Sequence, residues 1–447
     1  MLQKIQRLLV WFVIGLWQDN NAFAQADIPS GYWQGNISNQ GKQWKIALEF
    51  TKNAQNKTIG YVDFLEIGGY RRLFTISYDK DSLQLFREQP AGRPPLRFKG
   101  KLSPHSFSGV FDGIGITGAS FTVQPAYKYG YNEEDVFFYN DTIKLAGTLL
   151  TPKNGGPFPA IVFTHGSEPA TRSIYYGIAM HFVQKGIAAL IYDKRSVGES
   201  GGSDYRTAGI TNFATDALAG VQVLKKRKDI DVKRIGVFGH SQGGWIAPMT
   251  AVLSKDVAFI IASAASAVSA SEQSVFHRQN IMRQDGFSEE AIQKATAIRQ
   301  RMNAATKLYY TDSIAARKAL KQSETEIAAV LKEPWFESAA LPRELEINYP
   351  GDDLMELLFK DPVKIWNKVT VPVYLVWGLK DNVVPVDKRG IIEKALQQAG
   401  NKKVTVKLWA TTDHSQMFIP GNNEWDFPRE QPGYFEEMAE WVLSLKF

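Results

Sequence analysis

Strand-like and helix-like segments alternate through the middle of this chain, and this alternation constrains the fold more than any other feature. Short apolar runs with the composition of buried strands occur at residues 160–164, 187–192, 234–238 and 257–262. Segments with helical spacing lie between or after them, at residues 213–224 and 245–253. Because strands that alternate with helices lie parallel, the sequence predicts a doubly wound, mostly parallel sheet with helices on both faces.

The alternation stops after the fourth of these strands. Residues 268–360 are mostly polar helix formers, whereas strand-like runs resume at residues 371–377 and 404–408. The chain then closes with an amphipathic segment at residues 434–443. We therefore expect a helical cap over about residues 268–360, inserted between two strands of an α/β domain that spans residues 128–447.

The preceding part, residues 25–127, has a different pattern. Apolar and polar side chains alternate there, and one predicted strand face carries Trp44, Ile46, Leu48 and Phe50. Turn-forming residues separate these runs, so we expect a small all-β domain, a barrel or a sandwich. Aromatic residues such as Trp33 and Tyr70 are expected in its core rather than on a glycan-binding surface.

The first residues of the chain resemble a targeting segment. Lys4 and Arg7 precede an apolar stretch at residues 8–17, and residues 22–24 are Ala-Phe-Ala. This pattern predicts a secretory signal peptide over residues 1–24 and export to a periplasm or the medium. A membrane anchor is the alternative, but the apolar stretch has about 10 residues where a span needs about 20. We expect no stable membrane insertion once the signal is removed.

Composition excludes several classes of function. The chain has no cysteine, which rules out disulfides, thiolate metal sites and cysteine nucleophiles. A formal net charge of +6 is mild for 447 residues, and the one short basic run, residues 225–228, lies where a helix should end. No nucleic-acid partner is expected. The histidines lack metal-ligand spacing and no Gly-x-Gly-x-x-Gly opens a helix, so we expect neither cofactor nor metal. The oligomeric state stays open.

A glycine-flanked serine stands between a predicted strand and a predicted helix. The run at residues 239–244 is Gly-His-Ser-Gln-Gly-Gly, directly after the strand at residues 234–238 and before the helix at residues 245–253. A strand before Gly-x-Ser-x-Gly and a helix after it indicate a catalytic motif, since the serine of such a motif lies on a strained strand-to-helix turn. Ser241 is therefore the predicted nucleophile.

A serine hydroxyl needs a base that takes its proton, and histidine is the usual one. The chain has six histidines. Five lie in places unsuited to the role: His105, His165, His181, His240 and His277. His414 remains, in a predicted loop between the last strand and the last helix, where the chain order serine, acid, histidine puts the base.

The carboxylate that orients the base has two candidates. Asp381 follows the predicted strand at residues 371–377, and ligand sites in open α/β sheets form beyond such carboxyl ends. Asp413 is adjacent to His414, and neighbouring loop residues rarely reach the geometry that orients an imidazole. We favour Asp381.

A tetrahedral oxyanion also needs preorganised donors. The backbone N–H of Gln242, the residue after the nucleophile, is one candidate. The second should come from the loop after the first core strand, where we choose the N–H of Ser167, with Gly166 in reserve.

Together these segments resemble the α/β-hydrolase superfamily of serine hydrolases over residues 136–447. The hairpin at residues 143–149, the Thr-His-Gly-Ser at residues 164–167 and the loop at residues 192–200 are similar to the branch with bacterial carboxylesterases, serine aminopeptidase-like and prolyl oligopeptidase-like hydrolases. In that loop Ser196 stands where glycine is common. The resemblance implies attack by Ser241 on an acyl carbonyl, followed by hydrolysis of the acyl-enzyme.

Three functions remain open. The first is a carboxylesterase for small-molecule acyl substrates of short or medium length, with the cap forming part of the acyl pocket. The second is an exopeptidase, amidase or thioesterase with the same triad; an exopeptidase would need a carboxylate for the substrate ammonium, such as Glu272, Glu289 or Glu290 of the cap. The third is a non-catalytic binding protein, although such proteins are expected to lack the serine or the histidine.

Overall fold

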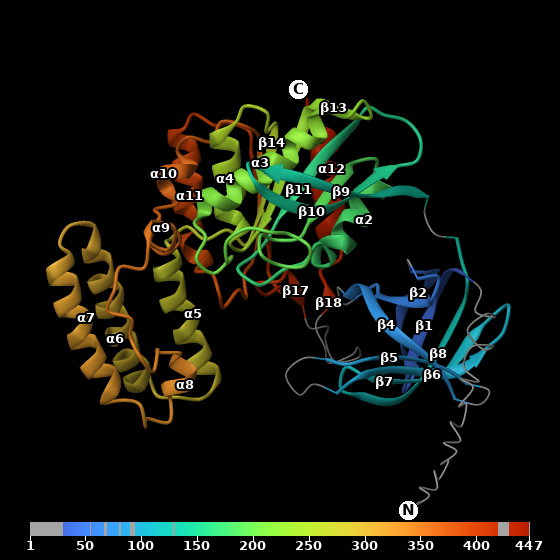
Figure 1. Cartoon of the computed structure of the whole chain (residues 1–447), viewed down its shortest axis with the longest axis horizontal. Coiled ribbons are helices and arrows are strands. Elements are labelled where there is room, and N and C mark those ends of the chain that lie inside the picture. Colours follow the sequence, from blue (N-terminus) through green and yellow to red (C-terminus); the bar gives the residue numbers. More distant parts are fainter. Residues whose placement is uncertain are drawn as a thin grey trace, which may run out of the picture. The chain divides into compact units, whose positions relative to one another are not determined.

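The computed structural model describes residues 30–446 apart from residues 54, 67–68, 80–81, 90–93, 128–129 and 419–428, so the predicted signal peptide lies outside the described residues. Contacts divide the chain into two compact units (Figure 1). One comprises Met1–Phe64 and Arg72–Tyr127, and the other Leu65–Arg71 and Lys128–Phe447. No helix within the described ranges has the length and apolar character needed to cross a membrane.

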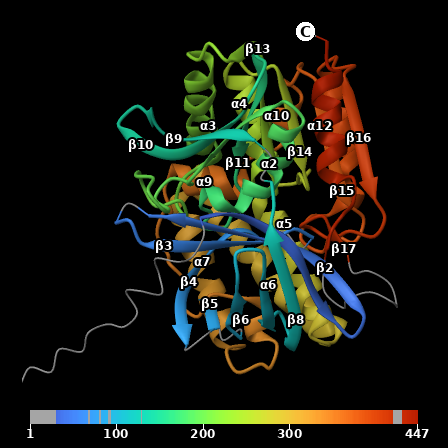
Figure 2. The same cartoon turned by 90° about the vertical axis from the view of Figure 1, so that its right-hand side faces the viewer.

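The first unit contains a closed barrel in which strands are neighbours in chain order and the first pairs antiparallel with the last (Figure 2). Its strands are β1 (Gly31–Asn39), β2 (Lys42–Lys52), β3 (Thr58–Phe64), β4 (Gly69–Asp79), β5 (Ser82–Arg87), β6 (Leu96–Leu102), β7 (Phe107–Gly113) and β8 (Ile116–Pro125). The expectation of a small β domain is confirmed, and the barrel form is the correct one of the two alternatives.

Aromatic side chains fill the barrel. The four residues predicted to share one face of β2 are each at most 1% exposed. The rings of Phe98 and Phe111 lie 4.6 Å apart, and Trp33 packs edge-on against Phe50 at 6.2 Å. Trp33, 2% exposed, is buried in the barrel as expected. Tyr70 is also buried, at 7% exposed, but it belongs to the second unit and packs in a cluster with Tyr175 and Tyr176, so its expected place in the core of the β domain is wrong.

The second unit is built on an eight-stranded sheet with the order β16-β15-β14-β13-β11-β12-β10-β9. Its strands are β9 (Tyr131–Asn140), β10 (Ile143–Pro152), β11 (Phe158–Thr164), β12 (Ala188–Tyr192), β13 (Ile230–His240), β14 (Phe259–Ser263), β15 (Val373–Gly378) and β16 (Val404–Trp409). The strands from β11 to β16 are parallel, whereas β10 pairs antiparallel with both β9 and β12. Because the central strands are covered on both sides, they consist almost wholly of buried residues.

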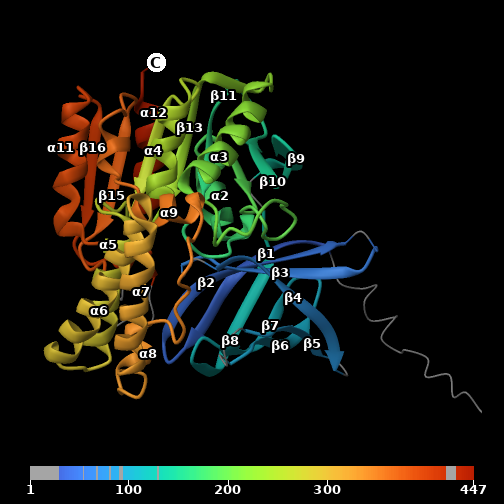
Figure 3. The ribbon, with the colours of Figure 1, turned by 60° about the vertical axis from the view of Figure 1, so that its left-hand side comes forward.

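Helices cover both faces of this sheet, as expected for the α/β-hydrolase fold. One face packs against α3 (Ile210–Lys225), α4 (Gly243–Leu253), α10 (Val363–Trp366) and α11 (Gly390–Gln398). The other packs against α2 (Tyr176–Gln184) and α12 (Tyr434–Ser444). Figure 3 shows α11 beside β16, where Ile392 and Leu396 pack with Val404. Short elements complete the unit: η2 (Arg172–Tyr175), η4 (Val386–Arg389), β17 (Met417–Phe418) and β18 (Arg429–Glu430).

The helical cap is inserted between β14 and β15. It consists of α5 (Ala270–Gln284), α6 (Glu289–Lys307), η3 (Leu308–Tyr310), α7 (Ser313–Ala328), α8 (Phe336–Ala339) and α9 (Asp352–Phe359). Met282, Ile298 and Trp335 belong to a separate buried cluster of its own. In Figure 1 the helices α6, α7 and α8 lie apart from the sheet and are joined to it through α5 and α9.

Candidate active site

Ser241 lies on a sharp turn between β13 and α4, and its φ of +57° is in the left-handed region. Such a conformation costs a non-glycine residue about 1–3 kcal/mol unless its surroundings hold it. Here the Ser241 N–H donates to Ser263 O at 2.9 Å, and its own carbonyl accepts from Gly244 N at 2.8 Å. Neighbouring strands and the helix therefore hold the side chain in its strained position.

The flanking glycines are required by close backbone contacts. A Cβ on Gly239 would lie 2.0 Å from Gly243 O, a Cβ on Gly243 would lie 2.9 Å from Thr164 Oγ1, and a Cβ on Gly244 would lie 2.7 Å from the Cα and Cβ of Ala265. The absence of side chains lets α4 start directly against β11, β13 and β14. This packing is the physical reason for the glycine spacing around Ser241.

The structure brings Ser241, His414 and Asp381 together in one hydrogen-bonded row. His414 Nε2 lies 2.9 Å from Ser241 Oγ, and His414 Nδ1 lies 2.8 Å from Asp381 Oδ2. The Asp381 side chain is fully buried and that of His414 is 16% exposed. With the proton on Nδ1 facing the carboxylate, Nε2 is free to accept the serine proton.

The loop after β15, which carries Asp381, packs closely against the loop after β16, which carries His414. A Cβ on Gly378, at the end of β15, would lie 2.3 Å from Thr412 O and 2.5 Å from Asp413 O, so glycine lets the acid loop touch the histidine loop. The other carboxylate oxygen, Asp381 Oδ1, accepts from the N–H groups of Val383 and Val384 at 2.8 Å each. Asp381 is thereby fixed at both oxygens.

Asp413, the rival carboxylate, has a different partner set. Its Oδ1 accepts from Ser415 N at 2.9 Å and from Met417 N at 3.0 Å. The side chain therefore closes its own loop, while the imidazole of His414 is paired with Asp381.

Two further imidazoles lie near His414. The His240 ring centroid is 5.1 Å from that of His414, and burial together with His414 lowers the pKa of His240 to about 3. His277 on α5 has its Nδ1 3.3 Å from Asn382 O, and burial lowers its pKa as well. Sequence reasoning set both aside; their place beside the row depends on how the loops pack.

The predicted oxyanion donors lie on the two loops expected to carry them. Gln242 is the N-terminal cap of α4, and Ser167 is an exposed residue of the loop after β11. Neither backbone N–H has an acceptor in the part of the chain that the structure describes. The side chain of Lys194, to which the sequence assigned no role, connects both loops: its Nζ donates to Gly166 O at 2.7 Å and to Gln242 Oε1 at 2.9 Å.

The cap carboxylates considered for an exopeptidase are largely engaged in the cap itself. Glu272 accepts from the N–H and the hydroxyl of Ser269 in the capping box of α5. Glu289 pairs with Arg283 at 2.7 Å. Glu290 is an exposed residue of the first turn of α6.

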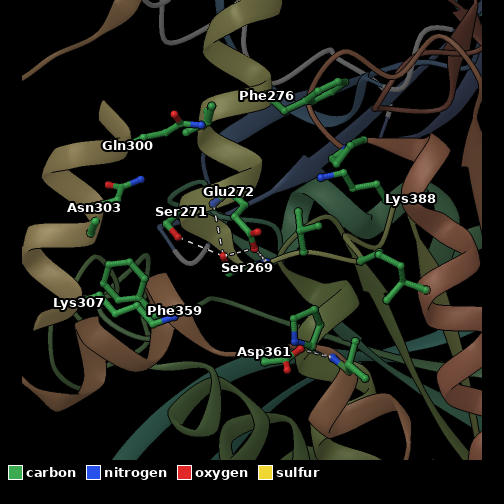
Figure 4. Close-up of a pocket in the computed structure, with 18 of the residues that line it drawn as sticks. Ser269, Ser271, Glu272, Phe276, Gln300, Asn303, Lys307, Phe359, Asp361 and Lys388 are labelled. Carbon is green, nitrogen blue, oxygen red and sulfur yellow. Dashed lines mark hydrogen bonds between the residues drawn. The ribbon is translucent and has the colours of Figure 1, made fainter. Parts of the chain in front are cut away.

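A cavity of about 800 Å³ lies between the cap and the sheet domain (Figure 4). One wall is the start of α5 with Ser269, Ser271 and Glu272, and α6 faces it with Gln300, Asn303 and Lys307. Neither Ser241 nor His414 lines this cavity. The connection to the row runs through α5, where Phe276 lines the cavity and the next residue, His277, contacts Asn382 O.

Among the described residues, no group of three or more His, Cys, Asp or Glu side chains is placed so that it could hold a metal ion.

The chain is similar to several known hydrolases. Residues 141–416 match the family described as X-Pro dipeptidyl-peptidase (S15 family). Esterase EstD of Thermotoga maritima is 26% identical over 430 residues, which cover 91% of this chain and 90% of that protein. A thiohydrolase of Arthrinium phaeospermum is 35% identical over 136 residues, 30% of this chain and 43% of that protein. The structure of an esterase from Pyrococcus furiosus aligns at 17% identity over 70% of this chain and 89% of that chain, with a TM-score of 0.43.

Proposed function

This α/β-hydrolase chain belongs to the X-Pro dipeptidyl-peptidase (S15) family, and from that premise we propose that it hydrolyses carboxylic esters through an acyl-enzyme on Ser241. The observation that carries the proposal is the hydrogen-bonded row from Asp381 through His414 to Ser241 Oγ. It provides a nucleophile, a base within 2.9 Å of it, and a buried carboxylate that orients the base.

The proposed reaction has two steps. His414 Nε2 takes the Ser241 proton as Oγ bonds to the ester carbonyl carbon, and the N–H groups of Gln242 and Ser167 donate to the oxyanion that forms. His414 then gives the proton to the departing alkoxide, which leaves as the alcohol. In the second step water is the nucleophile. It loses a proton to His414 and attacks the acyl carbon, the acid is released, and the proton returns to Ser241 Oγ.

Esters are the proposed substrates because the similarity to esterase EstD extends over nine tenths of both chains. Eight of the twenty residues that line the cap cavity are charged or carry an amide, among them Glu272, Gln300 and Lys307, and such a mixed lining favours short acyl groups over long aliphatic ones. An exopeptidase is the second candidate, and the peptidase description of the family favours it. A thioesterase is supported by the thiohydrolase match, which covers less than half of that protein.

A substrate panel tests the proposal. We expect the protein to release p-nitrophenol from p-nitrophenyl acetate and butyrate, with lower kcat/KM for octanoate, aminoacyl anilides and acyl thioesters. Ser241→Ala should abolish the activity with unchanged circular dichroism, whereas Ser203→Ala, at an exposed serine of another loop, should retain it. Faster turnover of aminoacyl anilides than of esters would favour the exopeptidase, and full activity in Ser241→Ala would refute the nucleophile.

We also propose that the chain is exported, because residues 1–24 have the pattern of a secretory signal. The mass of the protein recovered from the periplasm or medium should correspond to a chain that begins at Gln25. A full-length chain confined to the cell would contradict this.

A further inference from the structure

Lys194 is a buried lysine without a carboxylate partner. It is the second residue after the end of β12 and is 1% exposed, and it makes no ion pair with a carboxylate of the described residues. The rings of Tyr205 and Phe213 lie 5.0 Å and 4.7 Å from its Nζ. Burying an ammonium is costly unless its protons find good acceptors, so the groups that it does contact indicate what it is for.

Those contacts join the loops that follow β11 and β13. Nζ donates to Gly166 O at 2.7 Å and to Gln242 Oε1 at 2.9 Å, with Glu168 O at 3.4 Å. The backbone N–H of Lys194 also donates to Ala170 O at 3.0 Å. One side chain thus ties the loop of Ser167 to the residue that follows the nucleophile.

The contact with Gly166 O acts on the Ser167 N–H directly, because both belong to the same peptide group. In a trans peptide the C=O and N–H point in opposite directions, so a cation that fixes the carbonyl on one side fixes the N–H on the other. The ammonium also polarises the peptide and makes its N–H a stronger donor. On the second loop, the bond to Gln242 Oε1 holds the residue whose N–H is the other donor.

We propose that Lys194 is a positioning residue that preorganises both oxyanion donors, Gln242 N–H and Ser167 N–H, through one buried ammonium. The inference rests on the proposed function of Ser241. Lys194 touches neither the nucleophile nor the base; it acts through the two peptide groups. Its contribution appears when negative charge develops on the carbonyl oxygen, and much less when the substrate first binds.

The charge of Lys194 is expected to change within the working pH range. Burial lowers the pKa of Lys194 to about 8, and the carboxylate of Glu168 opposes this shift. Tyr205 faces the ammonium with its ring. Burial, with a smaller effect of the Lys194 charge, lowers the pKa of His165 to about 3, so that imidazole stays neutral. The flanking residues Asp193 and Arg195 are engaged with Arg172 and Asp216. The ammonium form, and with it the polarised peptide, is present below pH 8 and is lost above it.

Lys194→Met tests the proposal, since it keeps the length of the side chain and removes the ammonium. With p-nitrophenyl acetate, kcat should fall about 10- to 100-fold while KM changes less than about threefold, as expected for weakened oxyanion donors. The affinity for a trifluoromethyl ketone, which adds Ser241 Oγ to form an oxyanion, should fall by a similar factor. The decline of wild-type kcat near pH 8 should be absent from the variant.

Gln242→Met provides a second variant that keeps the backbone N–H and removes the acceptor of the lysine. It should lose less activity than Lys194→Met, and the double variant should be no slower than Lys194→Met alone, because both changes break the same contact. Lys226→Met, at an exposed lysine, is the matched control and should keep wild-type kcat.

The results separate the two proposals. If Ser241→Ala is inactive and folded Lys194→Met keeps wild-type kcat and ketone affinity, only the inference about Lys194 is wrong. If Ser241→Ala is active, the proposed function is wrong. Equal losses in kcat and in the affinity for a non-reactive competitive inhibitor would also overturn the inference, because they indicate a general distortion of the site.

Discussion

The substitution Asp381→Asn tests the orientation of the base with almost no change in shape. Asp381 Oδ1 accepts from two backbone N–H groups, those of Val383 and Val384, so the oxygen of an asparagine amide has to stay on that side. The NH2 group then faces His414 Nδ1 at the position where Oδ2 now lies, 2.8 Å away. An NH2 donor forces Nδ1 to accept and places the imidazole proton on Nε2, where it blocks transfer from Ser241.

A base held in the wrong tautomer lowers kcat by about 10⁴-fold, or about 5 kcal/mol of transition-state stabilisation. The assay is steady-state hydrolysis of p-nitrophenyl acetate at pH 7 to 8, with thermal melting to show that the fold is intact. Asp413→Asn is the matched control, because its remaining carbonyl oxygen can still accept from Ser415 N and Met417 N; its kcat should fall less than about threefold. Asp381→Asn with more than a tenth of wild-type kcat would refute this reasoning.

Two further predictions concern stability. Gly239→Ala should lower the free energy of unfolding in urea by about 3 kcal/mol or more, since its Cβ would lie 2.0 Å from Gly243 O. Gly390→Ala, whose Cβ would have nothing within 4 Å, should raise it by about 0.5–1 kcal/mol. Equal effects of the two variants would contradict the role of close packing at Gly239. Burial raises the pKa of Glu430 from 4.5 to about 7, so the folded protein holds a proton there that the unfolded chain releases, and stability falls as pH rises between these values. Glu430→Gln should therefore raise Tm at pH 8 and leave it unchanged at pH 4, and an equal effect at both would show that the carboxyl is not perturbed.

Much of the sheet domain could be predicted because its strands are short and apolar. The strand expected at residues 187–192 is Ala188–Tyr192, and that expected at residues 404–408 is Val404–Trp409. The strand expected at residues 234–238 is longer in the structure, Ile230–His240. Its first residues include the charged Asp231 and Lys233, so an apolar pattern does not extend to them. The pairing of β1 with β8, which closes the barrel, could not be predicted from local patterns, since it joins residues more than 80 apart in sequence, such as Ser38 and Ser120.

The residues of the hydrogen-bonded row could be chosen from sequence because each one follows a recognisable strand. Lys194 could not be assigned, although it also follows a strand, because its importance depends on two loops from different strands that meet at Nζ. The role of the cap carboxylate Glu272 could have been predicted, because Ser-x-x-Glu at residues 269–272 is a capping-box pattern, and Ser269 and Glu272 form the capping box of α5.

Covalent labelling tests directly whether Ser241 is the nucleophile. The folded protein is treated with a fluorophosphonate, which loses fluoride as serine oxygen bonds to phosphorus, and the modified peptide is sequenced by mass spectrometry. We expect one adduct per chain, on Ser241, and loss of labelling in His414→Ala, because the serine then lacks its base at 2.9 Å. An unlabelled protein, or an adduct on another residue, would contradict this assignment of the nucleophile.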